Sequence, residues 1–556
     1  MKKFFASQKL GIFSPYFVKP RHYMSNSKQP TNTGALATLV LVFFFWGFIA
    51  ASNSIFIPFC KTHFHLNQFQ SQLIGSAFYG AYFIGSLLLY LISSLVGYDI
   101  LNKIGYKKGI IYGLWISVAG ALLIIPSANA ASFPALLGSF FVVALGFSLQ
   151  QTAAQPFAIA LGDPSTGSHR LNLAGGVNSL GTTLGPIIVS FFLFGSIGNA
   201  AKEVTVTNIN NLYLIVASVF ALVALIFTFS KLPAGTDDAK FEASRKAAFS
   251  LITLTVLIGL VITIGQYTDI QKLPLLIATL IIVVGVLFYS NSSAIKNHDG
   301  WGAMKYPQLI YGMLGIFVYV GVEVTIDNNF GALLKTPGYL TDLGLDESKI
   351  SKYVSLYWGS LMIGRWTGAI GVFNLSAMGR KIATIVVPFV AFAIVLFVNH
   401  LYGSDITNLL PYALFVAIAI AAFFYGQEKP VKTLLTLAIL AAAAMLTGVF
   451  TSGIVSVYCF MSGGLCCSIM WPCIFSLGVG GLGKYTSQGS AFLIMMILGG
   501  AVIPPFQGSV GDMVGMHHSY LVAVACFAFL AWLALKLKTV LKAQGLNFDE
   551  QIGGGH

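Results

Sequence analysis

The sequence contains few charged residues. Only 9% of its 556 residues are Asp, Glu, Lys or Arg, whereas 56% are hydrophobic. Ordinary soluble domains carry about 25% charged residues, so this composition excludes that class. Apolar stretches of about 20 residues recur along most of the chain, and each is long enough to cross a bilayer. Because backbone polar groups must be satisfied inside a membrane, these lengths favour a bundle of α-helices over a β-barrel.

Acidic residues are the scarcer of the two charge signs. The chain has 18 acidic and 31 basic residues, which gives a net charge of +13. The basic residues are scattered between apolar stretches, and this distribution follows the positive-inside rule of membrane proteins. We therefore expect contact with a lipid bilayer and no binding of nucleic acid. The basic N-terminal tail, residues 1–35, and the C-terminal tail, residues 538–556, are both expected in the cytoplasm.

Paired cysteines and enzyme motifs are also missing. The six cysteines form no CxxC pair and have no histidine at metal-ligand spacing. The sequence contains no HExxH, no GxSxG and no phosphate-binding loop. We expect the cysteines to be packing residues, and we predict no catalytic residue, no metal site, no cofactor and no enzymatic activity.

Two parts of the sequence repeat. Residues 79–85 (YGAYFIG) resemble residues 358–364 (WGSLMIG), and the glycines five and fifteen residues after Arg170 recur after Lys484. The two offsets, 279 and 314 residues, differ by 35, which is the length of one helical hairpin. Duplicated membrane halves indicate a transporter whose substrate lies between them near the bilayer midplane.

The apolar stretches predict an all-α polytopic membrane protein of about sixteen transmembrane helices. Two six-helix halves account for twelve of them, and two extra hairpins account for the rest. The predicted parts are the first half (36–231), a linker with a transmembrane hairpin (232–305), and the second half (306–537) with an inserted hairpin at about 402–450.

Four stretches are similar to one transporter family. They are TAAQPF (Thr152–Phe157), RLNLAGGVNSLGTTLGP (Arg170–Pro186), SLYWGSLMIGR (Ser355–Arg365) and SIMWPCIFSLGVGGLGKYTSQGSAFLIMMILGGAVIPPFQG (Ser468–Gly508). They resemble the fucose-proton symporter family of the major facilitator superfamily, and most of all its bacterial glucose/galactose transporter branch. The resemblance implies the 6+6-helix fold, a location in the bacterial inner membrane, and secondary active transport of a hexose-type sugar such as glucose, galactose or fucose.

This chain departs from the family at two acidic positions. Fucose symporters carry N-D-I-L in the first helix and L-E-T-A-A-N-P in the fourth, and both carboxylates are implicated there in sugar binding or proton coupling. Ser54 and Gln151 stand at these positions here, and Gly175 replaces the glutamine of the motif RLNLAQ. Neither of the two family carboxylates is therefore present to carry a proton.

Two other acids lie within an apolar stretch. Glu323 and Asp327 are four residues apart, which places them on one face of a helix. A carboxylate inside a membrane is costly and is a functional candidate for that reason. We predict that Glu323 binds sugar and that both acids are candidates for coupling to H+ or Na+. Alternatively, Glu323 only bonds a neighbouring helix and Asp327 is solvated near the external end. Arg365 either pairs with an acid or extends toward the membrane surface.

Amides and tryptophans are the remaining candidates for sugar contact. Amides offer donors and an acceptor to hydroxyl pairs, and aromatic rings can cover the apolar face of a pyranose. The alternatives are helix-helix hydrogen bonding for the amides and interfacial anchoring for the tryptophans. The predicted sugar-binding residues of these two types are Asn53, Gln151, Gln155, Asn178, Trp358 and Trp471.

Four basic residues are predicted to form a cytoplasmic gate between the halves. They are Lys107, Lys108, Arg170 and Lys484. A simple positive-inside role is the alternative for each of them.

The expected function is transport by alternating access of a monomer, coupled to a cation. An uncoupled sugar facilitator and a transporter-derived sugar sensor are the alternatives. The short tails and linkers offer no large signalling extension, which counts against the sensor.

Overall fold

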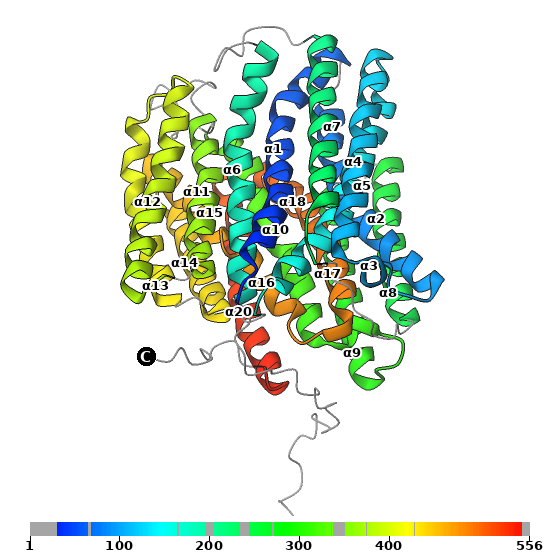
Figure 1. Ribbon diagram of the computed structural model, residues 1–556. Coiled ribbons are helices and arrows are strands. Elements are labelled where there is room, and N and C mark those ends of the chain that lie inside the picture. Colours follow the sequence, from blue (N-terminus) through cyan, green and yellow to red (C-terminus); the bar gives the residue numbers. More distant parts are fainter. Residues whose placement is uncertain are drawn as a thin grey trace, which may run out of the picture.

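The computed structural model describes residues 30–64, 68–163, 166–194, 205–233, 244–268, 272–334, 336, 351–373, 375–426 and 429–546. Within these ranges the protein is a bundle of helices without β-strands (Figure 1). Most of the predicted tails and the loop from Lys335 to Lys349 lie outside the described residues.

The first half and the linker contain nine helices in the described ranges. They are α1 (Thr33–His63), α2 (Gln68–Val96), the short α3 (Ile100–Ile104), α4 (Tyr106–Asn129), α5 (Phe133–Ala160), α6 (Gly167–Phe194), α7 (Val206–Phe229), α8 (Arg245–Tyr267) and α9 (Lys272–Lys296).

The second half consists of α10 (Pro307–Leu334), α11 (Ser351–Ala369), α12 (Ala377–Leu401), α13 (Ala413–Gly426), α14 (Pro430–Phe450), α15 (Gly453–Cys467), α16 (Met470–Val479), α17 (Thr486–Met495), α18 (Gly499–Val514), the short α19 (Met516–Ser519) and α20 (Leu521–Ala543). Short 3-10 turns precede α10, α13 and α17 and separate α17 from α18.

Length and hydropathy agree with a membrane bundle. Thirteen helical segments of the described chain are long and apolar enough to cross a membrane. Helices α1, α6 and α11 complete the sixteen predicted spans, each of which coincides with a helix or with two consecutive helices. Local signals set several helix ends. Asp99 accepts the backbone N–H of Asn102 at the start of α3, and Gly105 adopts φ +84° between α3 and α4, a conformation that favours glycine.

Within the first half, α1 packs very tightly against α6. A Cβ added at Gly181 of α6 would lie 2.2 Å from the backbone oxygen of Phe44 in α1. A Cβ added at Gly47 of α1 would lie 1.9 Å from the backbone oxygen of Asn178 in α6. Small residues allow membrane helices to approach at backbone distance, and these two glycines use that property.

The same packing pattern recurs in the second half. Helix α1 packs on α6, α2 on α5, and α4 on both α5 and α7; correspondingly, α10 packs on α18, α11 on α15, and α14 on both α15 and α20. A Cβ at Gly499 of α18 would lie 1.8 Å from the backbone oxygen of Phe317 in α10, which repeats the contact of Gly181 with Phe44. The two halves are therefore built on one plan.

This correspondence moves the inserted hairpin. The helix that pairs with α15 and α20 is α14, so the additional hairpin of the second half is α12 and α13 rather than residues 402–450. The 35-residue difference between the repeat offsets could not decide this, because any insertion between residues 364 and 484 produces it. The predicted range took in α14, whose long apolar sequence looks no different from that of its neighbours.

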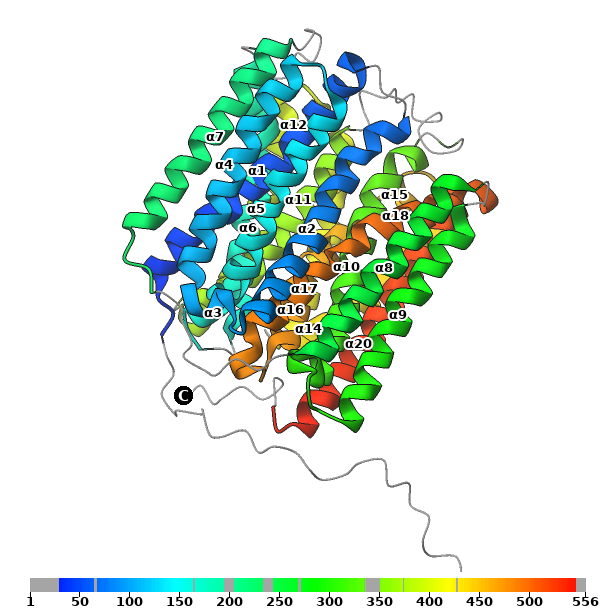
Figure 2. The ribbon, with the colours of Figure 1, turned by 90° about the vertical axis from the view of Figure 1, so that its right-hand side faces the viewer.

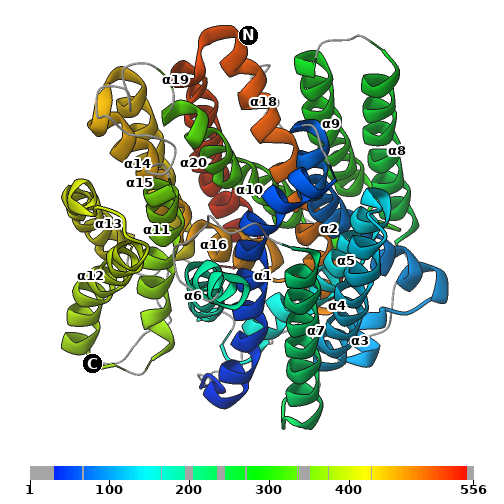
Figure 3. The same cartoon turned by 90° about the horizontal axis from the view of Figure 1, so that it is seen from above.

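The two extra hairpins lie at opposite edges of the bundle. Seen from above, α8 and α9 stand on one side and α12 and α13 on the other (Figure 3). The α8–α9 hairpin runs along the edge of the bundle (Figure 2) and contacts α2 of the first half as well as α10 and α18 of the second. The α12–α13 hairpin packs on α11, α14 and α15, all of which belong to the second half.

The start of the α8–α9 hairpin is bonded to both halves. The Tyr90 hydroxyl of α2 donates to the backbone oxygen of Ser244 at 2.7 Å. The Gln488 amide of α17 donates to the Ser244 hydroxyl at 3.2 Å and accepts the backbone N–H of Ala303 at 2.6 Å. Gly302 has φ +52°, and a Cβ there would lie 2.0 Å from the Ser244 hydroxyl. We call these five residues the Ser244 node.

Candidate functional site

The centre of the site is a carboxylate in the middle of α10. This helix is deeply enclosed: 89% of the residues in its most apolar 18-residue stretch are buried, whereas the corresponding share in α9 is 22%. Glu323 lies near its midpoint and is 9% exposed. A buried carboxylate is tolerated when it is paired and hydrogen-bonded, so its neighbours define what it can do.

Two donors meet at one oxygen of that carboxylate. The Tyr319 hydroxyl, one helical turn earlier, donates to Oε1 of Glu323 at 2.7 Å. Nη2 of Arg365 in α11 forms an ion pair with the same oxygen at 3.2 Å. The Tyr357 hydroxyl, also from α11, donates to the Glu323 backbone oxygen at 2.7 Å. Glu323 is therefore held in place by two helices of the second half.

Arg365 extends this group to the first half. Its Nη1 donates to the hydroxyl of Ser179 in α6 at 2.9 Å, and its Nε donates to the backbone oxygen of Ser468 at 3.3 Å. A Cβ at Gly175 would lie 3.2 Å from Cδ of Arg365, so the glycine leaves room for the arginine stem. Of the two alternatives for Arg365, the structure shows pairing with an acid.

Asp327 lies one turn beyond Glu323 and is partly exposed. The Trp358 side chain lies close to its carboxylate. Tyr79 of α2 is within electrostatic reach of both carboxylates, and a Cβ at Gly500 would lie 3.0 Å from the Tyr79 ring. Two predicted site residues, Asp327 and Trp358, thus meet each other, and a first-half tyrosine approaches them.

The predicted amides have different surroundings. Gln151 donates to the Tyr82 hydroxyl at 2.9 Å, and Asn178 donates to the backbone oxygen of Phe43 at 2.9 Å, which ties α6 to α1. Gln155 is 5% exposed, and its Oε1 has no hydrogen-bond partner among the described residues. Asn53 lies on α1, but its side chain is outside the described residues.

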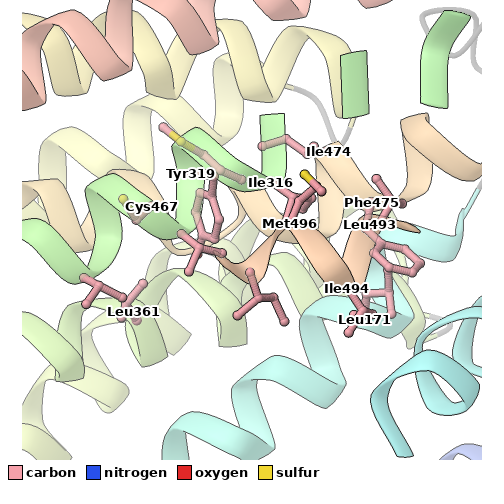
Figure 4. Close-up of a cluster of buried hydrophobic side chains, with 14 of the residues drawn as sticks. Leu171, Ile316, Tyr319, Leu361, Cys467, Ile474, Phe475, Leu493, Ile494 and Met496 are labelled. Atoms are coloured by element: carbon pink, nitrogen blue, oxygen red, sulfur yellow. The ribbon is translucent and has the colours of Figure 1, made fainter. Parts of the chain in front are cut away.

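An aromatic side chain packs beside Tyr319. Trp471 of α16 lies 6.1 Å from the Tyr319 ring and stacks on Phe475, also at 6.1 Å between centroids. Figure 4 shows Tyr319 and Phe475 in one cluster of buried apolar side chains that also contains Leu171 of the first half. Trp471 is therefore a packing partner of the residue that bonds Glu323.

Polar contacts join the two halves at one end of the bundle, which we call the closed end. The Ser487 hydroxyl donates to Asp99 at 3.1 Å, and the Asn102 amide donates to the backbone oxygen of Lys484 at 3.3 Å. His169 is 2.9 Å from the backbone oxygen of Gly368. Deeper in the bundle, the Trp366 indole donates to the backbone of Gly176, and Ser490 donates to the backbone of Thr152.

The predicted basic gate residues take little direct part in these contacts. Arg170 is fully buried, and its guanidinium donates to the backbone oxygens of Ala158, Ile159 and Asp163 within the first half. The Lys107 ammonium donates to two backbone oxygens at the end of α7, and Lys108 is exposed. Of the four, Lys484 joins the closed end through its backbone oxygen.

Several site residues were missed from the sequence. Ser179, Tyr319 and Tyr357 contact the Glu323–Arg365 pair directly, but serine and tyrosine are common in membrane helices and carried no signal. Asp99 was passed over because it lies in a loop, where acids are ordinary. The spacing of Tyr319 four residues before an embedded acid was a signal that could have been used.

The cysteines occupy packing positions. All six are free thiols; Cys526 is partly buried and the others are buried. In the described part of the chain, no group of three or more His, Cys, Asp and Glu side chains could hold a metal ion.

Comparison with known proteins gives one consistent family. The Major Facilitator Superfamily model matches residues 38–428. The glucose/galactose transporter of Brucella abortus biovar 1 (strain 9-941) is 30% identical over 517 residues, which cover 93% of this chain and 97% of the relative. The L-fucose-proton symporter of Escherichia coli (strain K12) is 24% identical, covering 89% of this chain and 91% of the relative.

Solved structures show the same fold. The transporter FucP in the outward conformation superposes with a TM-score of 0.61 at 23% identity, over 90% of this chain and 98% of that one. The proton:xylose symporter XylE, bound to 6-bromo-6-deoxy-D-glucose, gives a TM-score of 0.55 at 12% identity, over 91% and 96% of the two chains.

Proposed function

The chain belongs to the major facilitator superfamily, and we propose that it is a proton-coupled transporter of a hexose-type sugar in the bacterial inner membrane. Its relatives of similar length are named as glucose/galactose transporters and fucose-proton symporters. They support transport of a sugar rather than an enzymatic reaction. The two-half fold supports alternating access, with the closed end facing the cytoplasm as the loop charges indicate.

The observation that carries the proposal is the Glu323–Arg365 pair in the middle of the bundle. A carboxylate that exchanges an arginine partner for a proton can couple proton movement to a change in packing. The guanidinium 3.2 Å from Oε1 disfavours Na+ at the same oxygen, because two cations would repel each other there. These contacts support Glu323 as the proton carrier in place of the two missing family carboxylates.

The sugar site is proposed between Glu323 and the amides of α5. The unpartnered Oε1 of Gln155 is a buried acceptor that a sugar hydroxyl would satisfy. Trp358 lies next to Tyr357 at 5.8 Å between centroids and close to Asp327, so an indole face, a carboxylate and a tyrosine occur together. Such a combination suits a pyranose, which has both apolar faces and hydroxyl edges.

Uptake of labelled hexoses by proteoliposomes tests this function. We expect an inward proton gradient to drive sugar accumulation above equilibrium, and an imposed Na+ gradient to have no effect. In Glu323→Gln we expect accumulation to fall at least tenfold while exchange of sugar across the membrane persists, because the variant cannot release a proton but can still change conformation.

Asp512→Asn is the matched control, since it makes the same kind of change at an exposed acid. Equal accumulation by Glu323→Gln and the unchanged protein would contradict Glu323 as the carrier. Flux that ignores both gradients would identify an uncoupled facilitator, and absence of any flux would exclude transport of the sugars tested.

A further inference from the structure

The guanidinium of Arg365 is shared between the two halves. In the second half it pairs with Glu323 and bonds the Ser468 backbone, and in the first half it bonds the hydroxyl of Ser179. Each of its three nitrogens therefore has a different partner. Arginine presents its donors in a rigid planar fork, so these contacts are geometrically linked, and a lysine could not make them together.

The surroundings leave this fork few other orientations. The arginine stem lies close to Gly175, and Ser179 is only 2% exposed. Trp366, the next residue, lies against Gly176, where a Cβ would be 2.7 Å from the indole. With its stem confined along α6, the guanidinium can be turned mainly by gaining or losing a partner.

We propose that Arg365 is a positioning residue that links the charge on Glu323 to closure of the two halves. While Glu323 is ionised, the ion pair holds the guanidinium in the orientation in which Nη1 reaches Ser179 across the interface. When Glu323 takes up a proton, that attraction is lost and the bond to Ser179 weakens. The halves then separate more readily at the closed end. This inference rests on the proposed function in taking Glu323 as the proton carrier.

Few other groups near Glu323 can change charge in the same pH range. Its own helix contributes Tyr319 and Asp327, and α11 contributes Arg365 and Tyr357. Among the described residues, Cys467 of α15 and Tyr79 of α2 also lie within electrostatic reach. Tyrosine and cysteine ordinarily titrate above about pH 8, so Asp327 is the group whose charge must be controlled separately.

The test measures the opening of the closed end without sugar. Spin labels are placed on cysteines introduced at Lys108 and Lys538, two exposed positions in opposite halves, after the six native cysteines have been replaced. Distance distributions are recorded for the full-length protein in lipid nanodiscs. We expect Ser179→Ala and Glu323→Gln each to lower the ratio of closed to open populations about tenfold. A change of this size is expected because each variant loses a hydrogen bond to a charged group.

The double variant decides the question. If Arg365 links the two residues, Ser179→Ala combined with Glu323→Gln should open the closed end no further than the stronger single variant. Ser487→Ala is the matched control, because it removes a cross-half hydroxyl bond that goes to Asp99 instead. Its effect should add to that of Glu323→Gln. Additive effects of Ser179→Ala and Glu323→Gln, or no effect of either, would overturn the proposal.

A second measurement leaves Glu323 in place in case its replacement prevents folding. In the Asp327→Asn variant, we expect the open population to rise as the pH falls. When Ser179→Ala is added to that variant, we expect the open population to be higher at all pH values and no longer to depend on pH. A pH dependence that survives Ser179→Ala would overturn the link. Because these distances require no sugar, absence of sugar uptake would contradict the proposed function for the sugars tested and leave this inference standing.

Discussion

At the scale of single residues, the buried charges of this protein serve two different purposes. Glu323 and Arg365 pair across two helices in the middle of the bundle, where each needs the other. Arg170 bonds three backbone oxygens at and beyond the end of α5, and the Asp163 carboxylate lies within electrostatic reach of it. The last carbonyls of a helix have no partner within the helix, so Arg170 stabilises the turn into α6.

This role of Arg170 predicts a loss of stability on conservative replacement. Arg170→Lys keeps the charge but removes most of the five donors, so buried carbonyls are left without partners. We expect the free energy of unfolding to fall by about 2 to 4 kcal/mol. Thermal unfolding of the purified protein in detergent measures this. Lys108→Ala, at an exposed position on α4, is the control and should change the melting temperature little. Equal melting temperatures for the unchanged protein, Arg170→Lys and Lys108→Ala would show that Arg170 does not stabilise the turn.

The sequence revealed the residues whose chemistry is unusual for a membrane helix and missed their ordinary neighbours. Glu323 stood out because an embedded acid is rare, and the structure buries it in the middle of α10. Its roles in sugar binding and coupling stay predictions. Ser179 and Arg365, which Glu323 contacts indirectly and directly, lie 144 and 42 positions away from it in the chain. The fold brings such distant residues together, and the sequence pattern around Glu323 does not reveal them. The lysine and arginine gate was inferred from loop charge alone, which gives a side of the membrane but no partner.

At the scale of helices, backbone contact at glycine is the recurring feature. Gly181 meets Phe44 in the first half, and Gly499 meets Phe317 in the second. Helix existence and type were predictable because long apolar stretches have few alternatives in a membrane. The position of the inserted hairpin was not, because it depends on which helix pairs with α15 and α20, and hydropathy carries no information on partners.

Alanine substitution tests these contacts. Gly181→Ala places a Cβ against a backbone oxygen that cannot move aside, so we expect α1 and α6 to separate and the free energy of unfolding to fall by about 3 kcal/mol. Gly138→Ala on α5 is the matched control, because a Cβ there has nothing within 4 Å. It should be neutral or slightly stabilising. Similar melting temperatures for the two variants would contradict the backbone contact.

At the scale of the whole molecule, the cross-half contacts of the described residues gather at the closed end and extend inward as far as Ser179 and Thr183. The duplicated halves explain why this arrangement can alternate. Within each half, glycines meet the backbone of a neighbouring helix, while the halves meet each other through side chains and individual hydrogen bonds. The fold class and the two-half plan were predicted correctly from the repeats, and the family comparison confirms both.

A reversible cross-link tests whether the closed end must open. Asp99→Cys and Ser487→Cys place two thiols where side chains now share a hydrogen bond between the halves. We expect oxidation to abolish sugar uptake and reduction to restore it. Ser250→Cys with Ser290→Cys is the control, because those side chains are bonded within the α8–α9 hairpin. Full uptake by the oxidised Asp99/Ser487 variant would show that the halves do not separate here.

The Ser244 node has a consequence for the speed of the cycle. Tyr90 moves with the first half and Gln488 with the second, so a rotation that separates α2 from α17 at this end breaks one of the two bonds to Ser244. The hairpin then travels with whichever half keeps it. In a cycle with this rotation, that bond is broken and remade at each turnover, and the linker then contributes to the activation barrier as well as joining the two halves.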